Sequence, residues 1–78
     1  MNILIEYCIS WNFLPHASRV EAEIKTGYPD SDIKLIEGGG GVFDVKCNGK
    51  LIYSKQNIIG QPFPNKGEIT KLIEQEVD

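Results

Sequence analysis

The chain has 78 residues, of which 41% are hydrophobic and 24% are charged, and its formal net charge is -3. This length allows one domain, residues 1–78, with a single small core, and the composition is that of a globular chain. The acidic balance, without a cluster of lysine and arginine, argues against nucleic acid and anionic membranes as partners.

The apolar segment at the N-terminus is too short to span a bilayer, and it lacks the basic region and cleavage site of a secretory signal. We therefore expect a cytoplasmic protein. Its two cysteines, Cys8 and Cys47, are then expected to be reduced thiols. With His16 as the only histidine, the chain also lacks the four ligands of a structural zinc site, so we expect no metal.

A buried strand and an amphipathic helix are the first predicted elements. Residues 2–7 are mostly apolar and read as the strand. Asn12 can cap a helix over residues 13–26, and Pro15 falls in its first turn, where an N–H group has no partner within the helix. The apolar stripe of this helix consists of Phe13, Ala17, Val20, Ile24 and Tyr28.

Three further strands are predicted in the middle of the chain. Residues 32–37 alternate well enough to form the first of them, and Gly38 to Gly41 interrupt it. Residues 42–47 and 50–55 flank Asn48-Gly49, a pair that tolerates positive φ at both turn positions. This pattern predicts a β-hairpin.

The last third of the chain predicts a loop and a second helix. The loop, residues 56–64, contains apolar residues that we expect to lie over the sheet: Ile58, Ile59 and Phe63. The helix is expected to start at Asn65, with Glu68 reaching back to the Asn65 N–H as in a capping box. Its buried stripe is predicted to be Ile69, Leu72, Ile73 and Val77.

The resulting order is β-α-β-β-β-α, which predicts an α+β fold: a two-layer sandwich with a four-stranded mixed sheet and both helices on one face. The first two strands should be parallel with a right-handed crossover, and the hairpin adds antiparallel strands. Regular alternation then places five apolar residues on the open face: Leu4, Ile36, Val42, Leu51 and Tyr53, interrupted by Glu6, Asp44 and Lys46. The loop after the hairpin or a second copy of the chain could cover them.

Cys8 is the first candidate functional residue, because it follows a strand and precedes a helix. The free N–H groups and partial positive charge of a helix start stabilise a thiolate. We expect Cys8 to be the first residue after the strand and at least partly exposed; the alternative is an inert structural thiol. Cys47 should lie at the opposite end of the sheet, either packed with Phe43 and Val45 or at the frayed end of the strand, too far away for a disulfide with Cys8.

Other candidates surround this thiol. Trp11 could offer an aromatic wall to a ligand or could simply pack on the domain. Gly39, Gly40 and Gly41 could present backbone groups to a bound peptide or glutathione, or could form a plain tight connection. His16 is interpreted as a solvated surface residue, although a histidine near a thiol could act as a base.

Three segments of the chain resemble one known family: Tyr7-Cys8-Ile9-Ser10-Trp11-Asn12-Phe13-Leu14-Pro15, residues 41–45 and residues 48–55. They are similar to the selenoprotein W, T and H family, also called Rdx, of small redox proteins with a thioredoxin-like fold. The family pattern has Cys-x-x-Cys or Cys-x-x-selenocysteine after the first strand, then an aromatic residue and often a proline. Cys8, Phe13 and Pro15 match these positions, whereas the second redox position falls on Trp11.

The resemblance implies a thioredoxin-like fold and a function in cell redox homeostasis. Because Trp11 replaces the second redox residue, it implies at most a monothiol oxidoreductase, with Cys8 as the catalytic residue and with Trp11 and the three glycines at 39–41 as the substrate-binding set. Glutathione, as a co-substrate, or a thiol-containing protein would be the partner, and no other cofactor is expected. The alternative is a redox-inactive protein-interaction module or a homodimer.

Overall fold

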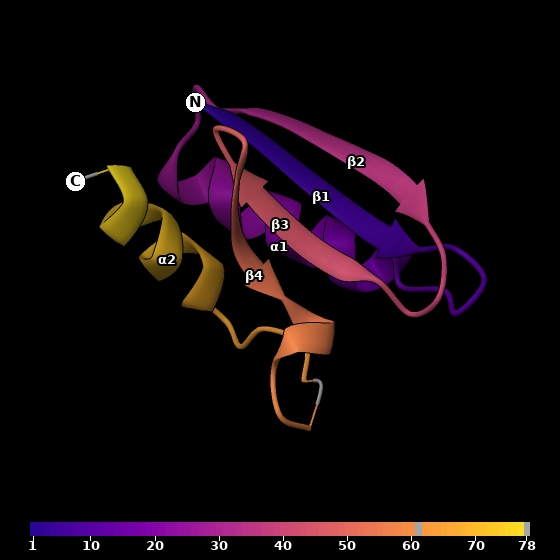
Figure 1. Ribbon diagram of the computed structural model, residues 1–78. Coiled ribbons are helices and arrows are strands. Elements are labelled where there is room, and N and C mark those ends of the chain that lie inside the picture. The colour runs from indigo at the N-terminus through magenta and orange to yellow at the C-terminus, as the bar shows by residue number, and fades with distance from the viewer. Residues whose placement is uncertain (61, 78) are drawn as a thin grey trace.

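The computed structural model describes residues 1–60 and 62–77. Its elements are β1 (Asn2–Cys8), α1 (Leu14–Gly27), β2 (Asp32–Gly38), β3 (Phe43–Cys47), β4 (Lys50–Ser54), the short 3-10 helix η1 (Lys55–Asn57) and α2 (Glu68–Val77). The expected order of strands and helices is confirmed (Figure 1).

The four strands form one mixed sheet in the order β2-β1-β3-β4. β1 and β2 are parallel, and β3 is antiparallel to both β1 and β4. The sheet carries its helices on one face, and α1 lies behind it in Figure 1. The predicted two-layer sandwich is therefore correct. None of the helices in the described residues is both long and apolar enough to cross a membrane.

The core lies between the sheet and the helices. Alternate residues of the two central strands supply one side of it: Ile3, Ile5 and Tyr7 from β1, and Phe43, Val45 and Cys47 from β3. The helices supply the other side: Ala17, Val20 and Ile24 from α1, and Ile69 and Ile73 from α2. The predicted helical stripes are thus confirmed in their central residues, whereas Val77 is largely exposed.

The hairpin between β3 and β4 turns at Asn48 and Gly49, whose φ angles are 51° and 86°. Positive values at both positions are typical of the type I′ turn that its sequence predicts. The pairing of β4 then shifts by one residue, because Tyr53 lies opposite Val45 whereas Leu51 lies opposite Lys46. This bulge turns Tyr53 into the core, where its hydroxyl donates to the Pro62 carbonyl at 2.7 Å. The placement of Tyr53 on the open face was wrong for this reason.

Both helices begin later than the sequence predicts. Asn12 has a φ of 58° in a tight turn, and Phe13 rather than Asn12 occupies the cap position of α1. In α2 the expected side-chain contact does form, since Glu68 Oε1 accepts the Asn65 N–H at 2.9 Å. Helical backbone nevertheless begins only at Glu68, because Gly67 has a φ of 81°.

The loop between η1 and α2 covers the core with only one of its three apolar residues. Phe63 packs edge-on against Phe13 and Phe43, with ring centroids 4.8 and 5.4 Å away. Ile59 is fully exposed, whereas Ile58 is 36% exposed and lines a hollow together with residues of β4. The expectation that the loop isoleucines lie over the sheet was therefore wrong for Ile59.

Candidate functional site

Cys8 is the last residue of β1, one position further along the strand than predicted. Its N–H donates to the Val42 carbonyl at 2.9 Å, and the Ile9 N–H donates to the Gly38 carbonyl at 3.2 Å. The two neighbouring strands therefore hold the backbone here in extended form. The chain then folds back sharply, and the Cys8 carbonyl accepts the Phe13 N–H at 3.0 Å.

The Cys8 side chain has no solvent exposure, which contradicts the expectation of a partly accessible thiol. The reason is the turn that follows it. The Asn12 N–H donates to the Ile9 carbonyl at 3.1 Å, so residues 9–12 close over the end of the strand. These turn residues are themselves exposed. The sulfur thus lies directly beneath a surface turn rather than in the middle of the core.

Hydrogen bonds hold the pKa of the Cys8 thiol below its ordinary value of 9.0. Burial is the largest single influence and raises the pKa, but several donors together outweigh it. The Ser10 hydroxyl lies 3.4 Å from the sulfur and can donate to a thiolate. The backbone N–H groups of Gly41, Trp11 and Ser10 act in the same direction. In contrast, burial and the Glu76 carboxylate raise the pKa of Cys47. The pKa values of the two thiols are therefore shifted in opposite directions from the ordinary value.

Trp11 and Gly41 lie against each other beside this thiol. The Trp11 side chain is 60% exposed, and its ring touches Phe13 only edge-on, with centroids 5.9 Å apart. A Cβ added to Gly41 would overlap the Trp11 ring, and Gly41 also has a φ of 77°. The packing of Trp11 therefore depends on glycine at this position.

Gly39 and Gly40 lie further out on the same loop. Both are exposed, and a Cβ added to either would meet nothing within 4 Å. The Gly40 carbonyl accepts a hydrogen bond from the Gln56 side chain, which ties the loop to η1. Of the predicted substrate-binding residues, the structure thus brings Trp11 and Gly41 together next to Cys8, while these two glycines form the open rim.

Two residues near the site were not singled out by the sequence. Ser10 supplies the side-chain hydrogen bond to Cys8, and its position two residues after a cysteine in a turn was the available signal. Lys55 is only 8% exposed, and its Nζ lies 5.5 and 5.2 Å from the ring centroids of Phe13 and Phe63. This cation–π arrangement joins two segments far apart in the chain, and no local pattern announces it.

His16 is not the solvated residue that its place in the first helical turn suggested. Its ring stacks on Phe63, with centroids 3.6 Å apart and planes 6° from parallel. Burial lowers the pKa of His16 from 6.5, and the positive charges of Arg19 and Lys55 lower it further.

Acid should therefore destabilise the fold through His16. As the pH falls, the unfolded chain takes up the proton first, near a pKa of 6.5, so the free energy of unfolding declines from there down to the lowered pKa of the folded state. Denaturant unfolding across this range measures the decline. The variant His16→Gln should lack this residue's share of it, and an identical pH profile for both proteins would contradict the expectation.

The comparisons with known proteins agree with this architecture. The sequence pattern of the Rdx family matches residues 2–75. The chain belongs to the Rdx family. This confirms the family resemblance seen in the sequence.

Two solved structures share the fold of this Rdx chain. A selenoprotein W-related protein from Vibrio cholerae aligns over 99% of the chain and 96% of its own length, with a TM-score of 0.86 and 21% identity. A Bordetella parapertussis protein aligns over 96% of the chain and 95% of its own length, with a TM-score of 0.79 and 23% identity. At these identities the likeness shows the fold.

The Rdx chain is also 32% identical, over 63 residues, to proteins named migration and invasion enhancer 1 from Mus musculus and Bos taurus. Each match covers 81% of the chain but 55% of the relative. The chain thus spans about half the length of the curated relatives it matches.

Proposed function

We propose that the protein is a monothiol redox protein in which Cys8 forms a mixed disulfide with glutathione or with a thiol-containing protein. One observation carries the proposal: the Cys8 sulfur is surrounded by the Ser10 hydroxyl and by backbone N–H groups that stabilise its thiolate. A thiolate is the nucleophile in disulfide exchange, and a lowered pKa makes more of it available near neutral pH.

The proposed step needs only one protein thiol. The Cys8 thiolate attacks one sulfur of glutathione disulfide, so that a Cys8–glutathione disulfide forms, the original S–S bond breaks, and one glutathione leaves as a thiolate. A reduced glutathione thiolate then attacks the glutathione sulfur of the mixed disulfide, so that glutathione disulfide forms and Cys8 leaves as the thiolate. Trp11 occupies the position from which a second cysteine would act, so the protein does not resolve the adduct itself.

Burial of Cys8 requires that the covering turn moves before reaction. The turn has few buried contacts, because Ile9, Ser10, Trp11 and Asn12 are all exposed. Such weakly packed surface segments open locally without global unfolding. We therefore expect the exchange to be slower than for an open thiol, with its pH dependence still set by the lowered pKa of Cys8.

The test is incubation of the native protein with glutathione disulfide, followed by intact-mass spectrometry. We expect one glutathione per chain, its loss in Cys8→Ser and its persistence in the matched control Cys47→Ser. A pH titration of thiolate absorbance in the ultraviolet measures ionisation without requiring access, and Cys8 should ionise below Cys47. An unmodified wild type, or an adduct on Cys47, would overturn the proposal.

A redox-inactive interaction module is the second candidate, and the burial of Cys8 favours it. Around the thiol the surface is apolar: Ile9, Trp11 and Leu14 are 48%, 60% and 40% exposed. Aromatic and aliphatic side chains of this kind are common at protein interfaces. If glutathione disulfide modifies Cys8 only after denaturation, this reading replaces the monothiol one.

A further inference from the structure

The face of the sheet opposite the helices carries two rows of opposite charge. In the first row, Lys34 of β2 and Lys46 of β3 flank Leu4 of β1, since both pair with that residue. In the second row, one step along the strands, Glu6 of β1 stands between Ile36 of β2 and Asp44 of β3. We call these the basic row and the acidic row.

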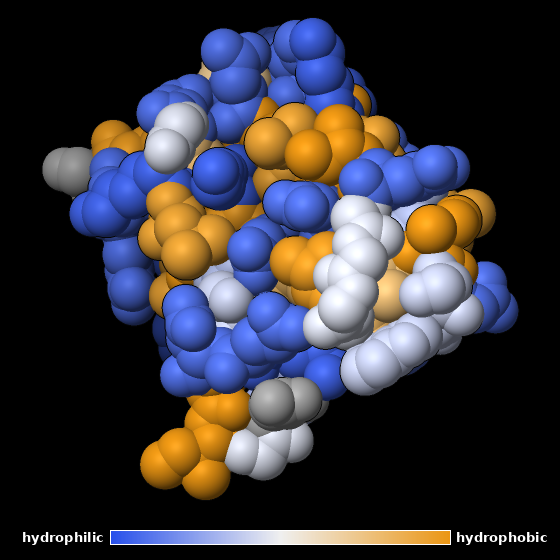
Figure 2. Space-filling model, turned by 45° about the vertical axis from the view of Figure 1, so that its right-hand side comes forward, coloured by the Kyte–Doolittle hydropathy of each residue, from blue (hydrophilic) through white to orange (hydrophobic). Residues whose placement is uncertain are grey.

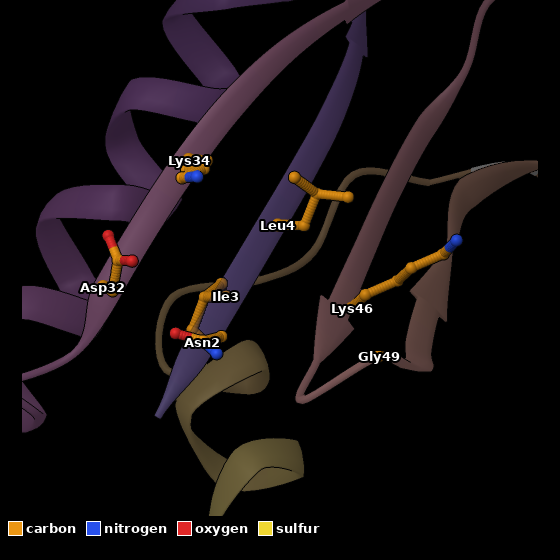
Figure 3. Close-up of a pocket in the computed structure, with 7 residues that line it drawn as sticks. All are labelled: Asn2, Ile3, Leu4, Asp32, Lys34, Lys46 and Gly49. Atoms are coloured by element: carbon orange, nitrogen blue, oxygen red, sulfur yellow. The ribbon is translucent and has the colours of Figure 1, made fainter.

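The basic row lies beside a shallow hollow of about 310 Å³ near the N-terminal end of β1. Figure 3 shows Lys34, Leu4 and Lys46 on three adjacent strands of this hollow, with α1 behind the sheet. Both lysines are exposed. Among the described residues that line the hollow, none comes from a helix, so Arg19 of α1 contributes nothing to it. The lining of the hollow combines Leu4 with two cations, Lys34 and Lys46, and one carboxylate, Asp32, at the opposite end of β1 from Cys8.

The acidic row is unfavourable as it stands. Glu6 and Asp44 lie directly opposite each other on antiparallel strands, where like charges destabilise a sheet. Asp44 Oδ1 is also buried and has no hydrogen-bond partner among the described residues. A buried carboxylate oxygen without a partner costs free energy that an incoming cation would recover.

Apolar side chains separate the charges on this face. Ile36 and Leu51 are 39% and 42% exposed, which is high for residues in the middle of strands. Figure 2 shows hydrophobic residues in separate patches among hydrophilic ones on the side it presents. Exposed apolar side chains among charges of both signs suit a partner whose own charges are complementary.

We propose that the open face binds a second copy of this chain, with the basic row of one copy on the acidic row of the other. This arrangement requires a two-fold axis that lies parallel to the sheet, perpendicular to the strands and midway between the two rows. Rotation about it places the basic row of each copy on the acidic row of the other, and each strand faces the same strand of the other copy. Lys46 then faces Asp44 of the other copy, and Lys34 reaches its Glu6. Each contact occurs twice, as in any isologous dimer.

The dimer should be weak and sensitive to salt. Four strands spaced about 4.8 Å apart, with about 3.3 Å per residue, give a flat face on the order of 400 Å² per copy, to which side-chain relief adds. This is at or below the usual size of a specific interface, so we expect dissociation in the micromolar range or above. Because charge pairs orient the contact, added salt should weaken it.

Sedimentation velocity over increasing protein concentration tests the proposal. The wild type should dimerise, and Lys46→Glu and Asp44→Lys should each weaken association roughly tenfold or more, because each places like charges against each other. An equimolar mixture of the two variants should dimerise again. In the mixed dimer, Glu at position 46 faces Lys at position 44 on one side, and the native pair is retained on the other.

Lys66→Glu is the matched control, since it makes the same charge change in the exposed segment before α2 and should leave association unchanged. If Asp44→Lys fails to fold, the pair Lys34→Glu and Glu6→Lys gives the same test, again with recovery on mixing. A wild type that stays monomeric at every concentration overturns the proposal. Folded variants that do not recover association when mixed overturn it as well.

Discussion

Trp11→Cys is expected to convert the protein into one that forms an internal disulfide with Cys8. The backbone N–H of residue 11 already contributes to stabilising the Cys8 thiolate, so the backbone that would carry the new thiol lies close to that sulfur. A low pKa for Cys8 then favours exchange with the new thiol as the resolving group. Counting free thiols after mild oxidation, with and without a dithiol reductant, should show reversible loss of both.

The fold should tolerate this change. The Trp11 side chain is 60% exposed, so its truncation should cost roughly 1 kcal/mol rather than the larger amount typical of a core aromatic. Trp11→Ser is the matched control, because it removes the same ring without adding a thiol. A Trp11→Cys protein that folds, yet keeps both thiols free, would show that the turn does not hold the two sulfurs in reach.

Gly41→Ala is expected to disturb the thiol site more than the same glycine-to-alanine substitution at Gly39 or Gly40. A Cβ at position 41 overlaps the Trp11 ring, and the residue must keep a φ of 77°. The left-handed conformation alone costs roughly 1 to 2 kcal/mol for a residue with a side chain. Either the exposed ring swings away or the Gly41 N–H moves off the sulfur, and in the second case the pKa of Cys8 rises toward 9.0.

Two neighbouring glycines separate these contributions. Gly40→Ala imposes positive φ without a clash, since Gly40 has a φ of 64° and open space around it. Gly39→Ala imposes neither and should behave as the wild type. Denaturant unfolding and the ultraviolet titration of thiolate absorbance measure both effects. If Gly41→Ala matches Gly40→Ala in stability and in thiolate pKa, the packing of Trp11 does not depend on having glycine at position 41.

Local patterns sufficed for much of the fold. The Asn48-Gly49 pair determines a turn by backbone conformation alone, and the stripe of Ala17, Val20 and Ile24 follows from helical spacing. The order of the elements then predicted which strands are parallel and which are antiparallel, and the structure agrees. These features depend on residues close together in the chain.

Some of the errors concern contacts between distant segments, and others concern local departures from regular strands and turns. A bulge in the pairing at Val45 and Lys46 places Tyr53 on the core face of the sheet instead of the open face. The regular alternation of residues in β4 does not indicate this bulge. His16 stacks on Phe63, which lies far along the chain and outside any predicted element. The exposure of Cys8 depends on how the following turn folds over the strand, so its position was predictable but its burial was not.

The central position of β1 in the sheet affects the order in which the surroundings of Cys8 form during folding. β1 precedes the other strands in the chain, yet it acquires its second neighbour only when β3 has been made and the Cys8 N–H bonds to the Val42 carbonyl. Long-range strand pairing of this kind forms late because the intervening loop must first be closed. The backbone of Cys8 is therefore expected to be held from both sides only once β3 has paired with β1, whereas the turn over its sulfur is made by the residues that directly follow it.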